Sequence, residues 1–134
     1  IAQLDQVREV YNVDRLAQAA ALASLNDQNY FSNCLGKILE QRQWLTNQFE
    51  AMNWRTIPSS TNFVFTQPCD ANGIMGEKIA QSLFKFLSQE KILVRYFPDH
   101  SLTNTFLRIS IGKPEEMTIL MDSIKKWKCP EKHL

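Results

Sequence analysis

The chain has 134 residues, of which 44% are hydrophobic, so it can bury one ordinary domain core. Its formal net charge is +1 at pH 7, which provides no strong field to attract nucleic acid or an anionic membrane surface. The long stretch at residues 16–36 is rich in Gln, Asn, Ser and Ala, so the sequence predicts neither a transmembrane helix nor a signal peptide.

Three cysteines lie far apart in the chain, at Cys34, Cys69 and Cys129. Their number is odd, they form no CxxC pair, and the only histidines are His100 and His133. This pattern argues against a disulfide framework and against a zinc site, and it favours a reducing cytoplasm. We therefore expect no metal ligands in this sequence.

Two helices are expected in the first part of the chain. Residues 15–25 are rich in alanine, with Asp14 or Asn12 available to accept hydrogen bonds from the first turn. Asn26 and Asp27 break this helix and can begin a second one that runs to about residue 52. The second helix carries an apolar stripe at three-and-four spacing, which favours packing into a core. The stripe consists of Phe31, Cys34, Leu35, Ile38, Leu45, Phe49 and Met52.

After the turn at residues 58–60, the pattern changes to the period of two that is typical of a strand. Within residues 61–66, Phe63 and Phe65 share one face and Asn62 lies on the other. A third helix is expected over residues 76–89. It is predicted to bury Ile79, Leu83, Phe86 and Leu87.

Two further strands are expected at residues 92–97 and 106–111. The loop between them is too short for a crossover, so the two strands are predicted to pair antiparallel. A last helix is predicted to begin at Pro114, because proline is favoured in the first turn. It is expected to bury Met117, Leu120, Met121, Ile124 and Trp127. The elements together predict an α+β fold, a small and mostly antiparallel sheet covered by helices.

Each of the last two strands contains an arginine, Arg95 in the first and Arg108 in the second. A guanidinium keeps its charge and its planar fork matches a carboxylate or phosphate, so two such strands suggest an anion site. A solvated sheet face, or pairing with a structural acid, would explain the same pattern. If the helices cover the face of Phe63 and Phe65, the alternation places Asn62 on the same face as both arginines.

Four segments carry a resemblance to a known family. They are YNVDRLAQAAALASL at residues 11–25, PSSTNFVF at 58–65, ILVR at 92–95 and LRISIGKPEE at 107–116. In this order and spacing, the chain resembles the C-terminal part of the histidinol-phosphate aminotransferases, which are pyridoxal-phosphate enzymes of fold type I. The resemblance covers essentially the whole chain, whereas LRISIG alone recurs across related aminotransferases.

The resemblance implies roles for individual residues. Arg108 would bind the anionic end of the amino substrate or of its keto-acid partner, and Arg95 would help to hold the substrate phosphate. Tyr11 and Asn12 would lie in a loop near the active site and the dimer interface, and Asn62 would shape the site without taking part in the chemistry. The implied reaction interconverts histidinol phosphate and imidazole-acetol phosphate with 2-oxoglutarate and glutamate, in a cytoplasmic homodimer.

The family's cofactor is bound through a lysine that precedes the segment at residue 11, so the matching lysine is not in this sequence. The lysines present sit on predicted helices or their ends; examples are Lys37, Lys78, Lys85 and Lys91. We therefore expect pyridoxal phosphate in the full-length parent, but no cofactor, catalytic residue or activity in this chain alone. Residues 1–26 would be the end of the large domain, and residues 27–134 the small C-terminal domain.

Other functions remain compatible with these residues. A related aromatic aminotransferase or a phosphothreonine decarboxylase would share the same motifs. A protein of another class, a non-catalytic binding or oligomerisation module, could keep the fold without the cofactor domain. The chain begins with Ile1 rather than methionine, as a piece of a longer protein would, and as a chain from which a tag has been removed would too. The sequence upstream would distinguish these possibilities, because a cofactor-binding lysine there would indicate the enzyme.

Overall fold

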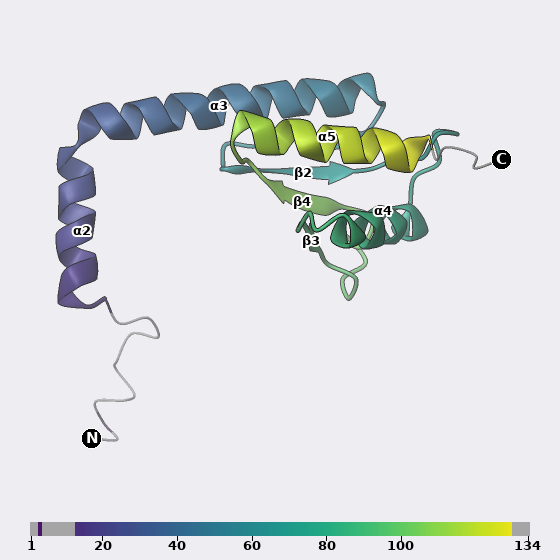
Figure 1. The fold of residues 1–134 in the computed structure, drawn as a ribbon. Coiled ribbons are helices and arrows are strands. Elements are labelled where there is room, and N and C mark those ends of the chain that lie inside the picture. The colour runs from purple at the N-terminus through teal and green to yellow at the C-terminus, as the bar shows by residue number, and fades with distance from the viewer. Residues whose placement is uncertain (1–2, 4–12, 130–134) are drawn as a thin grey trace. The chain divides into compact units, whose positions relative to one another are not determined.

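The computed structural model of the chain describes residue 3 and residues 13–129 (Figure 1). The chain divides into two units, Ile1–Gly36 and Lys37–Leu134. In chain order, its helices and strands are α2 (Arg15–Asn26), α3 (Gln28–Ala51), β1 (Arg55–Ile57), β2 (Phe63–Gln67), α4 (Glu77–Gln89), β3 (Arg95–Tyr96), β4 (Leu107–Ser110) and α5 (Pro114–Lys128).

The two predicted helix starts near the N-terminus are confirmed. The carboxylate of Asp14 accepts hydrogen bonds from the backbone amides of Leu16 and Ala17 at 2.8 and 2.9 Å, which caps α2. The carboxylate of Asp27 accepts from the amide of Tyr30 at 3.1 Å and so caps α3. Aspartate is suited to both positions because its oxygen satisfies amides that have no partner within the helix.

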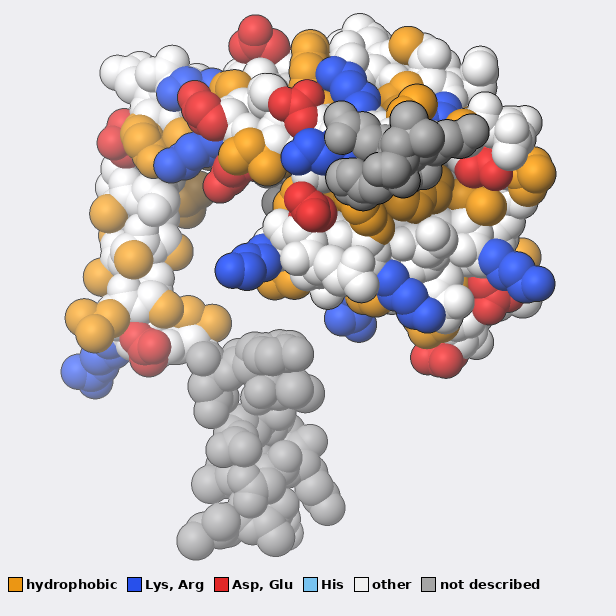
Figure 2. All heavy atoms as spheres, turned by 45° about the vertical axis from the view of Figure 1, so that its right-hand side comes forward, with side chains coloured by type: hydrophobic (Ala, Val, Ile, Leu, Met, Phe, Trp, Pro, Cys, Tyr) orange, Lys and Arg blue, Asp and Glu red, His pale blue; other side chains and the backbone are white. Residues whose placement is uncertain are grey.

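No residue of α2 is buried within this chain. Leu16 is 83% exposed and Leu25 is 67% exposed, and hydrophobic side chains are visible along α2 in Figure 2. In the described part of the chain, no helix is both long enough and apolar enough to cross a membrane.

The sheet has four strands in the order β1-β2-β4-β3, and every neighbouring pair is antiparallel. The predicted antiparallel pairing of the last two strands is therefore confirmed, although β3 is only two residues long. The strand β1 was not predicted. Its three residues are too few to display a period of two, and it begins just after Asn53, whose φ of 60° turns the chain at the end of α3.

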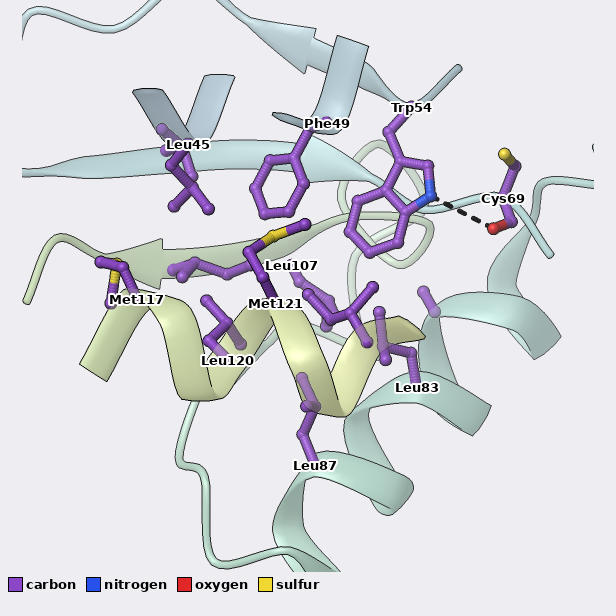
Figure 3. Packing of buried hydrophobic residues seen from close by; sticks show 14 of the residues in the cluster. Leu45, Phe49, Trp54, Cys69, Leu83, Leu87, Leu107, Met117, Leu120 and Met121 are labelled. Carbon is purple, nitrogen blue, oxygen red and sulfur yellow. Dashed lines mark hydrogen bonds between the residues drawn. The ribbon is translucent and has the colours of Figure 1, made fainter. Parts of the chain in front are cut away.

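The core of residues 37–129 lies between one face of the sheet and the helices. The sheet contributes Val64, Leu107 and Ile109, all almost fully buried. Figure 3 shows Leu45 and Phe49 of α3 pointing toward α5 and the sheet. The predicted apolar face of α5 is confirmed, except that its last member is only half-buried. Met117, Leu120, Met121 and Ile124 are the buried members.

Trp54 closes one end of this core. Its ring stacks on Phe49 with 4.7 Å between the ring centroids, and its indole Nε1 donates to the carbonyl of Cys69 at 3.2 Å (Figure 3). The thiol of Cys69 donates in turn to the carbonyl of Met52 at 3.2 Å. The amine of Lys128 donates to the same carbonyl at 3.1 Å, which ties the end of α5 to the end of α3.

Two predictions about buried helical faces were only partly right. In α3 the second half of the stripe is buried, at Leu45 and Phe49, whereas Phe31 and Leu35 in the first half are exposed within this chain. In α4, Leu83 and Leu87 are buried as predicted. Ala80 is buried there too, and the predicted Ile79 and Phe86 are half-buried.

The prediction that Phe63 and Phe65 share one face of β2 and Val64 lies on the other is confirmed, but the helices cover the face of Val64. Val64 and Thr66 point into the core, while Phe63 and Phe65 are half-buried on the opposite face. Phe65 lies directly across from Arg108 in the pairing of β2 with β4, so the two share that opposite face. A threonine can occupy the core position because its hydroxyl lies 2.9 Å from the hydroxyl of Thr56 and the two form a hydrogen bond.

The core boundary along α3 predicts a contrast between two substitutions. Phe49→Ala should destabilise the protein by about 3–5 kcal/mol, because it removes a fully buried ring and leaves a cavity. Leu39→Ala, ten residues earlier on the same helix, should change stability by less than about 1 kcal/mol, because Leu39 is 44% exposed. Urea denaturation would measure both, and equal losses would contradict this boundary.

Candidate anion-binding site

The two strand arginines lie side by side on the sheet. Arg95 of β3 and Arg108 of β4 are directly opposed in the antiparallel register. Both side chains are exposed, because the neighbouring residues Tyr96 and Leu107 point into the core from the other side. Directly opposed residues on neighbouring strands have Cβ atoms about 4.5–5.5 Å apart, so the side chains of this pair start close together. The predicted shared face for the two arginines is confirmed.

Contacts at the strand ends hold these positions. The amide of Ile92, just before β3, donates to the carbonyl of Leu87 at 2.8 Å and so ties the strand to the end of α4. After β4, the amide of Lys113 donates to the carboxylate of Glu116 at 2.8 Å, in the first turn of α5. A side chain at Gly112 would run into that of Glu116, so a glycine allows the helix to start directly after the strand. Both helices thereby fix the strands that carry the arginines.

Aromatic rings surround both guanidinium groups. The guanidinium carbon of Arg95 lies 5.5 Å from the ring centroid of Phe97, and that of Arg108 lies 5.8 Å from the same centroid. Arg108 also lies over Phe63, at 5.3 Å. These distances are within the range of cation–π attraction, about 6 Å from the centroid.

The aromatic row continues across the sheet to a third arginine. The ring of Phe65 meets that of Phe97 edge to face at 6.3 Å and stacks on that of Phe106 at 4.7 Å. The guanidinium of Arg55, on β1, lies 5.8 Å from the centroid of Phe106. We call this surface the arginine face. It consists of Arg55, Phe63, Phe65, Arg95, Phe97, Phe106 and Arg108.

Electrostatics make the arginine face receptive to anions. Within residues 13–129, neither Arg95 nor Arg108 forms an ion pair with a carboxylate. Like charges directly opposed across two strands repel each other. An anion bound between the two guanidinium groups would offset this repulsion. Each guanidinium can hold a carboxylate or phosphate through two parallel hydrogen bonds. The interpretation in which a structural acid neutralises these arginines therefore fails for the described part of the chain.

Of the other predicted site residues, Asn62 lies in the described part of the chain, and it is not brought to this face. Asn62 is exposed in a bend before β2, and its carbonyl accepts a hydrogen bond from the amide of Ile111 at 2.8 Å. The alternation along β2 places it on the side of Val64, so the prediction that it shares a face with the arginines was wrong. Tyr11 and Asn12 lie outside the described residues.

Neither a cofactor site nor a metal site is evident in the described residues. Among them, no group of His, Cys, Asp and Glu could hold a metal ion. The lysines singled out in the sequence lie on helices or just beyond one, and all are exposed: Lys37, Lys78, Lys85 and Lys91. None belongs to the arginine face. The residues in hand do not fit a cofactor that is held through a lysine.

Two features of the arginine face were missed from the sequence. Arg55 was missed with the short strand β1 that carries it. Phe97 lies two residues after Arg95, so a period of two would have placed both on one face. That signal was present, but Phe97 was not assigned to a face.

Comparison with solved structures gives the class of protein. Histidinol-phosphate aminotransferase from Sinorhizobium meliloti, solved in complex with pyridoxal-5'-phosphate, matches with a TM-score of 0.69 and 26% identity, over 92% of this chain and 34% of that chain. The enzyme from Clostridium acetobutylicum matches with a TM-score of 0.69 and 25% identity, over 99% of this chain and 38% of that chain. The fold is that of part of a fold type I aminotransferase.

Sequence comparison gives the family. Residues 1–124 match the family described as aminotransferase class I and II, and the chain belongs to that family. It is 46% identical to histidinol-phosphate aminotransferase of Geotalea uraniireducens over 126 residues, which are 94% of this chain and 34% of the relative. It is 50% identical to that of Geotalea daltonii over 117 residues, 87% of this chain and 31% of the relative. The chain thus spans about a third of the length of these relatives.

Tyr96 anchors β3 from the core side of the sheet. Its ring packs against Phe84 of α4, with 5.6 Å between the ring centroids. Its hydroxyl is buried and has no hydrogen-bond partner among the described residues. Burial raises the pKa of Tyr96 above its usual value of about 10, and the nearby carboxylate of Glu77 raises this pKa further.

We predict that Tyr96→Phe stabilises the protein, by about 1 kcal/mol at pH 7, because it removes a buried hydroxyl that has no partner. The gain should grow above about pH 10, because the unfolded tyrosine ionises there before the folded one and the wild type loses stability. Urea denaturation at pH 7 and pH 10.5 would measure it, with the exposed Tyr30→Phe as control at pH 7. A loss of stability at pH 7 would mean that the hydroxyl has a partner.

Proposed function

We propose that this chain is the C-terminal part of a histidinol-phosphate aminotransferase, and that its arginine face forms the anion-binding half of the substrate pocket. The single observation that carries the proposal is the opposed pair Arg95 and Arg108, which has no carboxylate partner within residues 13–129. The names of the relatives, each matched over most of this chain, agree with such a pocket.

The parent reaction would convert histidinol phosphate and 2-oxoglutarate into imidazole-acetol phosphate and glutamate. Every one of these molecules carries at least one carboxylate or phosphate, and guanidinium forks bind such groups with two hydrogen bonds each. In this assignment Arg95 helps to hold the substrate phosphate, and Arg108 binds the anionic end of the amino substrate or of the keto acid. The aromatic rings beside them exclude water and strengthen these charge contacts.

The cofactor of the parent would be pyridoxal phosphate, which takes up the amino group and acts as an electron sink. Its lysine would lie in the part of the parent that precedes this chain. We assign residues 1–26 to the end of the large domain and residues 27–134 to the small domain. The absence of buried residues on α2 fits the first assignment, and the core built from buried residues between Leu45 and Ile124 fits the second.

The exposed apolar residues of α2 and of the start of α3 would lie against the large domain or the second subunit of a homodimer. Leu16, Leu22, Leu25, Tyr30 and Phe31 are the side chains concerned. Tyr11, Asn12 and Asn62 would border the pocket or that interface. Cys34, Cys69 and Cys129 are all free, in keeping with the reducing cytoplasm that we propose for the protein.

A second candidate is a non-catalytic binding module. Such a module could use the arginine face, which as defined above contains no lysine, to bind an anion without a cofactor. A related aromatic aminotransferase or phosphothreonine decarboxylase is a nearer variant of the first proposal. The experiments below separate an enzyme from a binding module, and substrate profiling of the longer protein would separate the variants.

The first experiment concerns the cofactor. The 134-residue chain, mixed with equimolar pyridoxal phosphate and reduced with borohydride, should acquire no stoichiometric pyridoxyl group on a lysine. The reason is that Lys37, Lys78, Lys85 and Lys91 are exposed and the half-buried Lys128 is tied to the carbonyl of Met52. Mass spectrometry would measure the label, and a longer protein that includes the preceding two-thirds should acquire it. A specific label on one lysine of the short chain would contradict the proposed division, and an unlabelled longer protein would favour the binding module.

The second experiment concerns Arg108. In the longer protein, Arg108→Ala should lower kcat/KM by about 30-fold to several thousand-fold, since losing a buried charged contact costs about 2–5 kcal/mol. Arg108→Lys should not restore activity, because an ammonium lacks the planar fork. The control is Lys85→Ala, which removes an exposed cation of α4 outside the arginine face and should have a much smaller effect. Near-normal kinetics of Arg108→Ala would mean that the arginines merely lie on a solvated sheet face and do not bind the substrate.

A further inference from the structure

One aromatic ring contacts both of the opposed arginines. The centroid of Phe97 is 5.5 Å from the guanidinium carbon of Arg95 and 5.8 Å from that of Arg108. We propose that Phe97 is a positioning residue, which holds the two guanidinium groups in place before the substrate anions arrive. This inference rests on the proposed function, because it assigns Phe97 a role in the same pocket.

The first step concerns the charge of the pair. Two cations directly opposed on neighbouring strands repel each other, and with no carboxylate partner among the described residues they would turn away from one another into water. The face of an aromatic ring is electrically negative and attracts a guanidinium. A ring that both groups contact therefore offsets part of their repulsion, and unlike a carboxylate it leaves their hydrogen-bond donors free for the substrate.

The second step concerns the ring itself, which can position the arginines only if something else holds it. Phe97 is half-buried and meets the ring of Phe65 edge to face at 6.3 Å. Phe65 in turn is stacked on the buried Phe106, with 4.7 Å between the centroids. The aromatic row therefore supports Phe97 from the sheet side. Its place does not depend on the arginines.

The third step is an asymmetry between the two arginines. Arg108 has a second ring, because Phe63 lies 5.3 Å from its guanidinium carbon. For Arg95, Phe97 is the one aromatic ring within cation–π range among the described residues. Loss of the Phe97 ring should therefore release Arg95 more than Arg108. The group bound by Arg95, the substrate phosphate in our assignment, should be affected more than the group bound by Arg108.

The test uses the longer, cofactor-loaded protein and compares Phe97→Leu with Phe97→Tyr. Leucine keeps apolar bulk but has no aromatic face, whereas tyrosine keeps the face. Phe97→Leu should raise KM for the phosphate-bearing substrate roughly twofold to fivefold, as expected for the loss of an exposed cation–π contact. In the same variant, the KM for the keto acid should rise less and kcat should change little. In Phe97→Tyr, both KM values should stay close to those of the wild type.

A second readout does not depend on turnover. Inorganic phosphate should raise the Tm of the wild-type protein, because a ligand that binds only the folded state stabilises it. This rise should be smaller in Phe97→Leu and normal in Phe97→Tyr. The matched control is Phe86→Leu, a half-buried phenylalanine of α4 away from the arginine face, which should change neither KM nor the phosphate-induced rise. If the leucine variant does not fold, Phe97→Met replaces it.

Several outcomes would overturn the inference. Equal effects of the leucine and tyrosine variants would mean that bulk, and not the aromatic face, matters at this position. Changes in Phe86→Leu that match those in Phe97→Leu would indicate a general packing effect. The variants Arg95→Ala and Arg108→Ala distinguish failure of the proposed anion-binding function from failure of the positioning role of Phe97. If they leave both KM values unchanged, the proposed function fails; if they raise them and Phe97→Leu does not, only the positioning role fails.

Discussion

The opposed pair of arginines on β3 and β4 is the constraint around which the sheet is arranged. Neither guanidinium can lose its charge, and the register places the two directly across from each other. The protein tolerates this pair by keeping both heads exposed and by surrounding them with aromatic rings in place of acids. A structural carboxylate would have neutralised the pair at the expense of its capacity to bind an anion from outside.

The opposite face of the sheet supplies the rigidity that this arrangement requires. Leu107 and Ile109 flank Arg108 in sequence and are almost completely buried under the helices. On β3, which is only two residues long, Tyr96 packs against α4 directly beside Arg95. Packing on one side of each strand therefore fixes the charged side chains on the other. The unpartnered hydroxyl of Tyr96 indicates that this anchoring is not optimised for stability alone.

The predictable parts of the fold were those in which a local signal and the tertiary structure agree. Asp14 and Asp27 marked both helix starts, and the alternation around Arg108 gave the correct face. The alternation in β2 was correct, but the face that carries Phe63 and Phe65 was taken, on hydrophobicity, as the one that the helices cover. Their rings instead pack beside the guanidinium groups on the arginine face, and the core position went to Thr66, whose hydroxyl is satisfied by Thr56. The contacts of Phe63 with Arg108 and of Thr66 with Thr56 join residues that are distant in sequence, so a local sequence pattern does not reveal them.

The exposure of α2 has a consequence for its helix content. It is 12 residues long and buries nothing within this chain. Helices of about that length are marginal in water, since forming the first turn is unfavourable and few further hydrogen bonds follow. The capping bonds from Asp14 help to start the helix, but they add only about 1 kcal/mol. In water and without a covering surface, α2 would therefore be only partly helical, and its helix content should rise when another surface buries its leucines.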